Sequence, residues 1–253
     1  MTADWRFLLK PKWLLSHLFV GALIAAFIWA GFWQLDRLNQ SKEQNATIEA
    51  RAAEEPMSVA QLSQLPESEV NFRPMADTGR YVDGELIRVA NRSLDGVAGD
   101  WVVALFETDD GLQVLVNRGF IRRDDVAAPP LDPTTITGWF RNTEVKEGTF
   151  GATDTGTGER VPRLDVAVLA TRFGLDVAPA WVQLEPGEAT ISTGTELEVP
   201  PQGLALPPLT NGNHLSYAVQ WFTFTVLGAG AYVLVLRKLV RQRATEMTSA
   251  PTD

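Results

Sequence analysis

Two long runs of apolar residues lie near the two ends of the chain and enclose a polar middle. The first run, from Trp13 to Leu35, holds 23 residues without a charged side chain, and the second, from Leu215 to Leu236, holds 22. At a rise of about 1.5 Å per residue, each run is long enough to cross a hydrocarbon core about 30 Å thick. The pattern predicts two membrane-spanning helices on either side of a separate domain.

Between these runs, the pattern predicts a helical stalk followed by short strands. Residues 38–55 contain no Gly or Pro, so the first helix is expected to continue outward and to stop before Pro56. Beyond it, β-branched and aromatic runs separated by turn signals indicate an antiparallel sheet or barrel. The expected strands are 80–82, 85–90, 101–106, 112–120, 135–141 and 181–184, with turns at 83–84 and 109–111, a helix at 164–173, a plain loop at 148–158 and an extended return at 200–208.

The charges divide in the same way as the apolar runs. Residues 1–12 and 237–253 each carry a net charge of +2, whereas the middle carries -13 and brings the total to -9. Basic residues outside both spans predict that both termini are cytoplasmic and that the middle is exported. The first apolar run is too long for the core of a cleaved signal peptide, so we expect a retained anchor. The expected parts are 1–12 cytoplasmic, 13–35 membrane-spanning, 36–213 periplasmic, 214–236 membrane-spanning and 237–253 cytoplasmic.

The amino-acid composition disfavours nucleic-acid binding and excludes several kinds of metal and cofactor site. An acidic exported domain is poorly suited to nucleic acid, whose affinity comes mainly from basic side chains. The chain has no cysteine, which removes thiolate metal sites, iron–sulfur clusters and c-type haem attachment. Only two histidines are present, His17 near the cytoplasmic end of the first span and His214 at the exported end of the second. Roughly 25 Å of helix separates them, so they cannot ligate one iron atom within one chain.

His214 opens the second span after the polar turn Asn211-Gly212-Asn213. At helical spacing, His214, Tyr217 or Ala218, Trp221 and Thr225 share a face, which is expected to meet the first span near Trp29, Trp33 and Gln34. A neutral imidazole there could bind a metal, with aromatic rings beside a planar ligand. The alternative is an interfacial histidine that caps its helix and bonds to its neighbours.

Three other features have a structural and a functional interpretation. The segment 33–38, which includes Arg37, either anchors the chain at the interface or forms a packing surface beside His214. Arg118, in Asn117-Arg118-Gly119-Phe120, either forms an internal ion pair or binds a ligand carboxylate. Small residues at 22, 26 and 30, and at 228–231, predict close packing between the two spans or against a partner's helices.

Three motifs in register resemble the surfeit-locus-one (Surf/Shy) family of cytochrome c oxidase assembly proteins. They are Gly31-x-Trp33-Gln34-Leu35-x-Arg37-Leu38, then 114–120 (VLVNRGF), then Asn213-His214-Leu215-Ser216-Tyr217-Ala218-x-x-Trp221-Phe222. The family usually has Trp where Phe120 stands, and commonly Asn where Gly212 stands. The resemblance covers nearly the whole chain, including its two-span topology.

The resemblance implies an assembly factor for haem-copper oxidases rather than an enzyme. Bacterial members are associated with binding haem a and delivering it to the catalytic subunit of cytochrome c oxidase, and haem a synthase is a second candidate partner. His214 becomes the candidate axial ligand, with Trp33, Gln34, Arg37, Tyr217 and Trp221 as inferred neighbours. The immediate first span, without a mitochondrial presequence, points to a bacterial inner membrane.

We therefore predict a membrane protein with two transmembrane α-helices, both termini inside, flanking a mainly antiparallel β (α+β) exported domain. One rival interpretation is a cofactor-free scaffold for oxidase subunits. A copper chaperone is disfavoured, because Cys is absent and the four Met form no cluster. A sensor is disfavoured because the predicted cytoplasmic tails are too short for an output domain.

Overall fold

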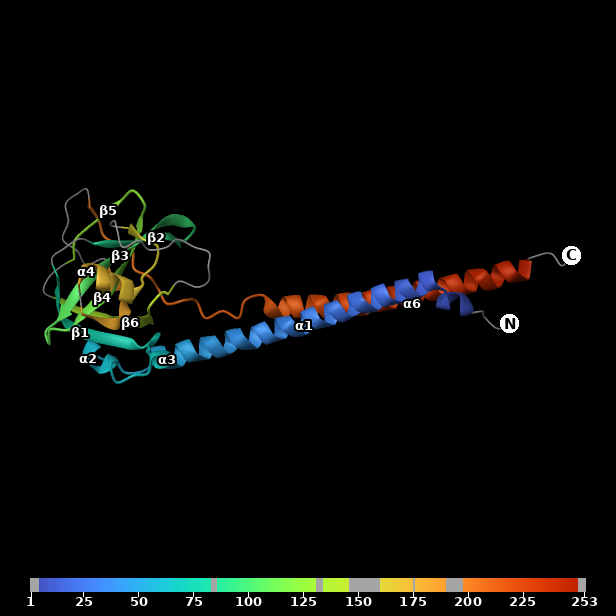
Figure 1. Cartoon of the computed structure of the whole chain (residues 1–253), viewed down its shortest axis with the longest axis horizontal. Helices are drawn as coiled ribbons and strands as arrows, with labels where there is room; N and C mark the ends of the chain where they lie inside the picture. Colours follow the sequence, from blue (N-terminus) through green and yellow to red (C-terminus); the bar gives the residue numbers. More distant parts are fainter. Residues whose placement is uncertain are drawn as a thin grey trace. The chain divides into compact units, whose positions relative to one another are not determined.

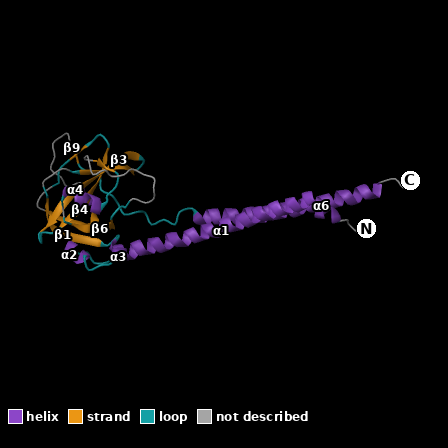
Figure 2. Ribbon diagram, viewed as in Figure 1, coloured by secondary structure: helices purple, strands orange, loops and turns teal. Residues whose placement is uncertain are grey.

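The computed structural model describes residues 5–82, 86–130, 134–145, 160–174, 176–189 and 198–249. The chain forms two compact units, one of residues 1–46 and 209–253 and the other of residues 47–208. The first is helical, and the second contains the strands (Figures 1 and 2). The turn predicted at 83–84 and the loop predicted at 148–158 lie outside the described residues.

The helical unit is built on two long helices, α1 (Pro11–Ala52) and α6 (His214–Ser249), which run side by side in opposite directions (Figure 1). Contacts follow the antiparallel order: Ser16 and His17 meet Tyr232, and Phe27 meets Trp221 and Phe224. Both helices contain stretches long and apolar enough to cross a membrane. The stalk predicted for residues 38–55 is the continuation of α1, which ends at Ala52, four residues before Pro56.

The end of the helical unit that carries the N-terminal segment is closed by a short 3-10 helix, η1 (Arg6–Leu9). Phe7 and Leu8 are buried there together with Val240 of α6. The guanidinium of Arg243 lies 4.1 Å from the centre of the Phe7 ring. Of the small-residue stripe predicted for helix packing, Ala22 and Ala26 are exposed, whereas Ala30 is partly buried, as are Ile24 and Phe27 at helical spacing from it.

The sheet unit is a ring of paired strands. The order β1-β6-β8-β4-β3 closes on itself through pairing of β1 with β3, and β2 and then β7 extend the sheet beyond β3. The strands of this sheet are β1 (Pro74–Tyr81), β2 (Ile87–Leu94), β3 (Val97–Thr108), β4 (Gln113–Arg122), β6 (Thr134–Asn142), β7 (Arg160–Val161) and β8 (Val177–Leu184). A small second sheet joins β5 (Val126–Ala127) to β9 (Glu198–Val199).

The expectation of a mainly antiparallel sheet is confirmed, although three pairings of strands are parallel. The pairs β4–β8, β2–β7 and β5–β9 are parallel. Parallel neighbours need long crossover connections, whereas turn signals in a sequence report only local hairpins. The sequence predicts only the end of β1. At Gly79 the backbone of β1 approaches the Glu107 carbonyl of β3 so closely that a Cβ atom would not fit.

Apolar side chains form one core inside the ring and another on its outer side. Phe106, Val116 and Phe140 are fully buried in the inner core. The outer core packs against the helix α4 (Val166–Phe173), which begins with the Asp165 side chain accepting from the Val168 amide and ends at Gly174 in the left-handed region. Three shorter helices complete the unit: α2 (Val59–Leu62), α3 (Glu67–Val70) and α5 (Pro186–Ala189).

Candidate functional site

The start of α6 brings His214 to Gln34 of α1. The His214 Nδ1–H donates to the Gln34 Oε1 at 2.9 Å, and both side chains belong to the helical unit. The other ring nitrogen, Nε2, makes no hydrogen bond among the described residues. Since a neutral imidazole carries one proton, the bond to Gln34 places that proton on Nδ1 and leaves the lone pair on Nε2. His214 is thus oriented as a metal-ligating histidine is, by a hydrogen bond to the ring nitrogen that does not bind the metal.

The turn before His214 sets this orientation. Gly212 has a φ of 60° and its amide donates to the Thr210 hydroxyl, while the Asn213 carbonyl accepts from the Tyr217 amide in the first turn of α6. Asparagine, the residue that commonly stands at position 212 in the resembled family, also tolerates the left-handed region. The Asn45 amide of α1 donates to the Asn211 Oδ1 at 3.2 Å. The turn and the helix start are therefore each bonded to α1.

His17 differs from His214 in a way that bears on metal binding. Its Nε2–H donates to the Leu8 carbonyl at 3.1 Å, and the Tyr232 hydroxyl donates to its Nδ1 at 2.5 Å. Both ring nitrogens are therefore engaged in holding η1 and α6 against α1. His17 is a packing residue in this structure, whereas the Nε2 of His214 is available.

The predicted aromatic neighbours are only partly brought to His214. Trp221 lies on the same face of α6, about two turns further along, and its ring meets Phe27 at a centroid distance of 5.5 Å. Tyr217 is exposed, because Ala218 takes the position that faces α1. The expected face therefore contains the second of the two alternatives, Ala218 rather than Tyr217.

Trp33 and Arg37 form a separate surface on α1. Trp33 is one residue from Gln34, which rotates it by about 100° around the helix axis. It stacks with Trp29 at 6.5 Å and 15°, and the Arg37 guanidinium lies 5.6 Å from its ring. Arg37 also donates to Gln40, one turn away. A shallow groove follows this face, lined by Trp29, Phe32, Trp33, Leu35, Asp36 and Asn39.

The motif 117–120 lies in the sheet unit and holds the segment that returns the chain to α6. The Phe120 amide donates to the Gln202 carbonyl at 2.8 Å and the Gln202 amide donates back at 2.7 Å. Gln183 of β8 donates to the carbonyls of Leu204 and Ala205 and accepts from Arg141. Sequence reasoning missed Gln183 and Gln202; a buried Gln inside an apolar strand is the signal that could have indicated the first.

Arg141 belongs to the same hydrogen-bond network as Gln183. Burial lowers the pKa of Arg141, but its guanidinium keeps hydrogen-bond and aromatic partners. Its Nε donates to Asn71 Oδ1 at 3.0 Å, its Nη1 donates to Gln183 Oε1 at 2.6 Å, and it lies 4.3 Å from the Phe72 ring. The network links β6 and β8 to the return segment. Its role in this structure is to hold the return segment against the strands.

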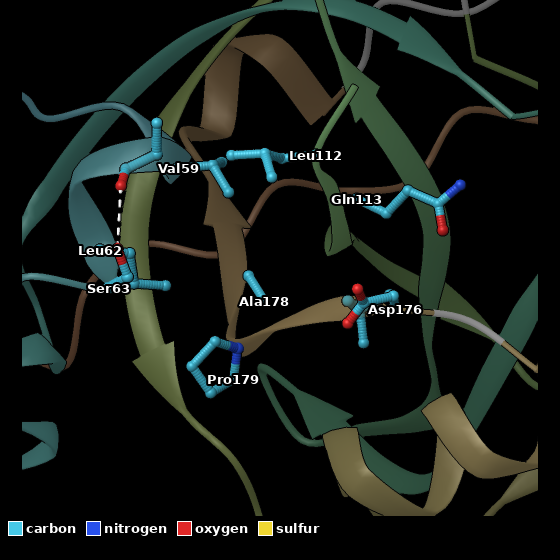
Figure 3. A pocket seen from close by; sticks show the side chains of 10 residues that line it. Val59, Leu62, Ser63, Leu112, Gln113, Asp176, Ala178 and Pro179 are labelled. Carbon is cyan, nitrogen blue, oxygen red and sulfur yellow. Dashed lines mark hydrogen bonds between the residues drawn. The ribbon is translucent and has the colours of Figure 1, made fainter. Parts of the chain in front are cut away.

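The sheet unit also contains a pocket between α2 and the first residues of β4 and β8. Figure 3 shows side chains from these elements around it, among them Leu62, Leu112 and Pro179. Among the described residues that line it, Asp176 is the titratable one. In the described part of the chain, no three His, Asp or Glu side chains gather to hold a metal ion. A metal ion at His214 would therefore have no three-ligand cluster of these side chains around it in the described residues.

Two long apolar helices joined to a barrel-like sheet domain suggest a membrane protein, with one available imidazole where the second helix begins. The chain belongs to the SURF1 family, whose model matches residues 21–226. That range includes all three motifs, which confirms the family resemblance. The family is known in general as cytochrome oxidase assembly factors.

Relatives in bacteria and in a unicellular eukaryote match most of the chain. An uncharacterized SURF1-like protein of Mycobacterium bovis is 25% identical over 262 residues, which cover 97% of this chain and 91% of that protein. A SURF1-like protein of Mycobacterium tuberculosis, also uncharacterized, matches to the same extent. A SURF1-like protein of Monosiga brevicollis is 26% identical over 226 residues, or 82% of each chain.

Proposed function

We propose that this protein assists assembly of haem-copper cytochrome c oxidase by holding haem a through His214 and helping its insertion into the catalytic subunit. The observation that carries the proposal is the bond from His214 Nδ1–H to Gln34, which leaves Nε2 with an available lone pair. Haem a, when bound, would supply an iron centre that accepts an imidazole nitrogen. Family membership supports the assembly role.

The residues around His214 fit a carrier better than a permanent haem protein. His17 is about 25 Å away along α1 and has both ring nitrogens engaged, so this chain offers one histidine ligand. A single ligand from the protein would hold haem a and would still allow its release to the catalytic subunit. The stacked Trp29 and Trp33 offer an exposed aromatic surface at the same end of the helix pair, and Arg37 adds a cation there.

The functional proposal is tested by deleting the gene from its host and recording the visible spectrum of the membranes. We expect the haem a signal of the oxidase and its activity to fall, because the catalytic subunit would not receive its cofactor, and both to return with the wild-type gene. A deletion strain with normal haem a content and normal oxidase activity would contradict the assembly role.

We further propose an inner-membrane location with the sheet unit in the periplasm. The basic residues that follow the apolar part of α6, Arg237, Lys238, Arg241 and Arg243, support this orientation together with Lys10 and Lys12.

Alkaline phosphatase fused after residue 145 is expected to be active, and the same reporter fused after residue 253 inactive, because the enzyme matures only outside the cytoplasm. Green fluorescent protein at residue 253 serves as the reciprocal control and should fluoresce. An active phosphatase at the C-terminus would exclude the proposed topology.

A cofactor-free scaffold for oxidase subunits remains the second candidate function. Ala22 and Ala26 are exposed on α1, and small side chains let another helix approach closely. The visible absorption of protein purified from cells that make haem a separates the two candidates. A carrier shows a haem spectrum that depends on His214, whereas a scaffold shows none and still copurifies with the oxidase.

A further inference from the structure

Arg118 is the extra residue of a β-bulge in the sheet unit. On β3, the consecutive residues Val102 and Val103 pair with Gly119 and Asn117 of β4, so Arg118 has no partner opposite it. The Asn117 Oδ1 accepts from the Gly119 amide at 3.0 Å, which closes the backbone around the bulge. Bulges re-aim side chains and are frequent beside functional sites.

The side chain of Arg118 is buried without a counter-ion among the residues that the structure describes. It is 1% exposed, and its Nη1 donates to the Ala128 carbonyl at 2.7 Å. Its Nη2 is buried with no hydrogen-bond partner, and no carboxylate of the described residues forms a salt bridge with it. The Tyr81 ring centre lies 5.9 Å from the guanidinium. Burial lowers the pKa of Arg118, although an arginine remains charged.

The same unit provides counter-ions for another buried charge. Asp100 is fully buried, with Arg88 Nε 3.0 Å from one carboxylate oxygen and Arg160 Nη2 2.6 Å from the other. A buried charge without a partner is costly, so a fold normally supplies one, as it does for Asp100. The internal ion pair that the sequence left open for Arg118 is absent from the described residues.

We propose that Arg118 is the anchor of a binding site for a small molecule that carries a carboxylate, at the bulge of β4. A guanidinium presents a planar pair of N–H donors that matches the two oxygens of a carboxylate. The Ala128 carbonyl is a neutral acceptor that occupies one of these nitrogens, and Nη2, although buried, has no hydrogen-bond partner among the described residues. The inference concerns the sheet unit alone and does not rest on the proposed haem function.

The cover over Arg118 is the segment 126–128, in which Ala128 is buried and Val126 is exposed. The strand that precedes Ala128 pairs with β9 over two residues only, with one further bond from the Ala128 amide to the Val199 carbonyl at 3.0 Å. Val126 is 59% exposed. Short, exposed pairings open at low free-energy cost. Opening of this segment would also remove the Ala128 carbonyl from Arg118, so a carboxylate and the cover compete for the same guanidinium.

Acetate is the probe, and uncharged acetamide of the same shape is its control. Saturation-transfer NMR on full-length, haem-free protein in detergent is expected to label the acetate methyl group more strongly than the acetamide methyl group. The difference should be lost in Arg118→Met and Arg118→Gln, and retained in Arg123→Gln, which removes an exposed arginine just beyond the same strand. Acetate at about ten times its Kd should raise Tm by about 3 to 6 °C in wild type, and not in the two Arg118 variants.

Stability measurements separate this site from a structural role. Without acetate, Arg118→Met should keep or raise Tm, because it removes a charge that lacks a partner. Arg118→Lys keeps the charge but not the paired donors, and should weaken acetate binding even if the Met variant does not fold. Equal labelling of acetate and acetamide in wild type would overturn the proposal.

Discussion

Replacing His214 with alanine is expected to remove haem a from protein purified from cells that make it. The imidazole Nε2 is the nitrogen that the structure leaves available, and its loss removes the proposed histidine ligand at this end of the helix pair. We expect the haem content to fall by more than the roughly 10- to 100-fold that loss of a ligand-orienting hydrogen bond usually costs in metal affinity. The measurement is haem per protein, from visible absorption after extraction.

Two further variants test whether the loss of haem is specific to His214 and whether it depends on the bond to Gln34. His17→Ala is the matched control, because it removes the other histidine, whose nitrogens bond to Tyr232 and Leu8. It should keep its haem content even if the helix pair is less stable. Gln34→Leu removes the acceptor that holds the proton on Nδ1, so haem content should fall about tenfold while His214 remains. An unchanged haem content in His214→Ala would remove His214 as the ligand and favour the scaffold.

Replacing Gly119 with alanine is expected to destabilise the sheet unit by about 3 kcal/mol. Gly119 has a φ of 132°, where a residue with a Cβ atom is strained by about 1–3 kcal/mol. A Cβ atom would also overlap the Gln202 carbonyl oxygen and lie 2.8 Å from its carbon. Displacing Gln202 would break its two backbone hydrogen bonds with Phe120, each worth about 1 kcal/mol.

The destabilisation is measured by denaturant unfolding, and hydrogen exchange at residues 198–204 locates it. Gly187→Ala is the neutral control, since its Cβ meets no atom within 4 Å and its φ is not positive. Gly111→Ala isolates backbone strain, because its φ is 79° with open space around it, and should cost about 1 kcal/mol. A Gly119→Ala protein as stable as Gly111→Ala, with normal exchange at Gln202, would show that the close approach is unimportant.

The helices and strands were predictable where they depend on the hydrophobic pattern of residues close together in the chain. The apolar runs indicated both long helices, and residues 101–106 and 112–120 lie within the hairpin of β3 and β4, whose turn ends with the Gly111 amide donating to the Thr108 carbonyl. The strand β1 was mostly missed, because Gly79 and the polar residues around it lower strand propensity while pairing with β3 and β6 stabilises it.

The candidate site was predictable only in part. Helical spacing placed His214 and Trp221 on one face of α6, and the contact of His214 with Gln34 follows from two antiparallel helices. The same reasoning did not show which of Tyr217 and Ala218 faces α1. It also did not show that Trp33 and Arg37 lie on a different face of α1 from Gln34. Rotation by about 100° per residue makes neighbours in a motif point to different faces.

The sequence by itself determined the two apolar helices, the acidic middle between basic ends, and the three motifs that carry the family. These features are local, because periodicity and composition act over one or two turns of chain. Only the tertiary structure decided that β1 closes the ring on β3, that Gln34 orients His214, and that Arg118 is buried without a carboxylate partner in the described part of the chain. Each depends on residues far apart in the chain, whose meeting is set by packing of whole elements rather than by any spacing within one of them.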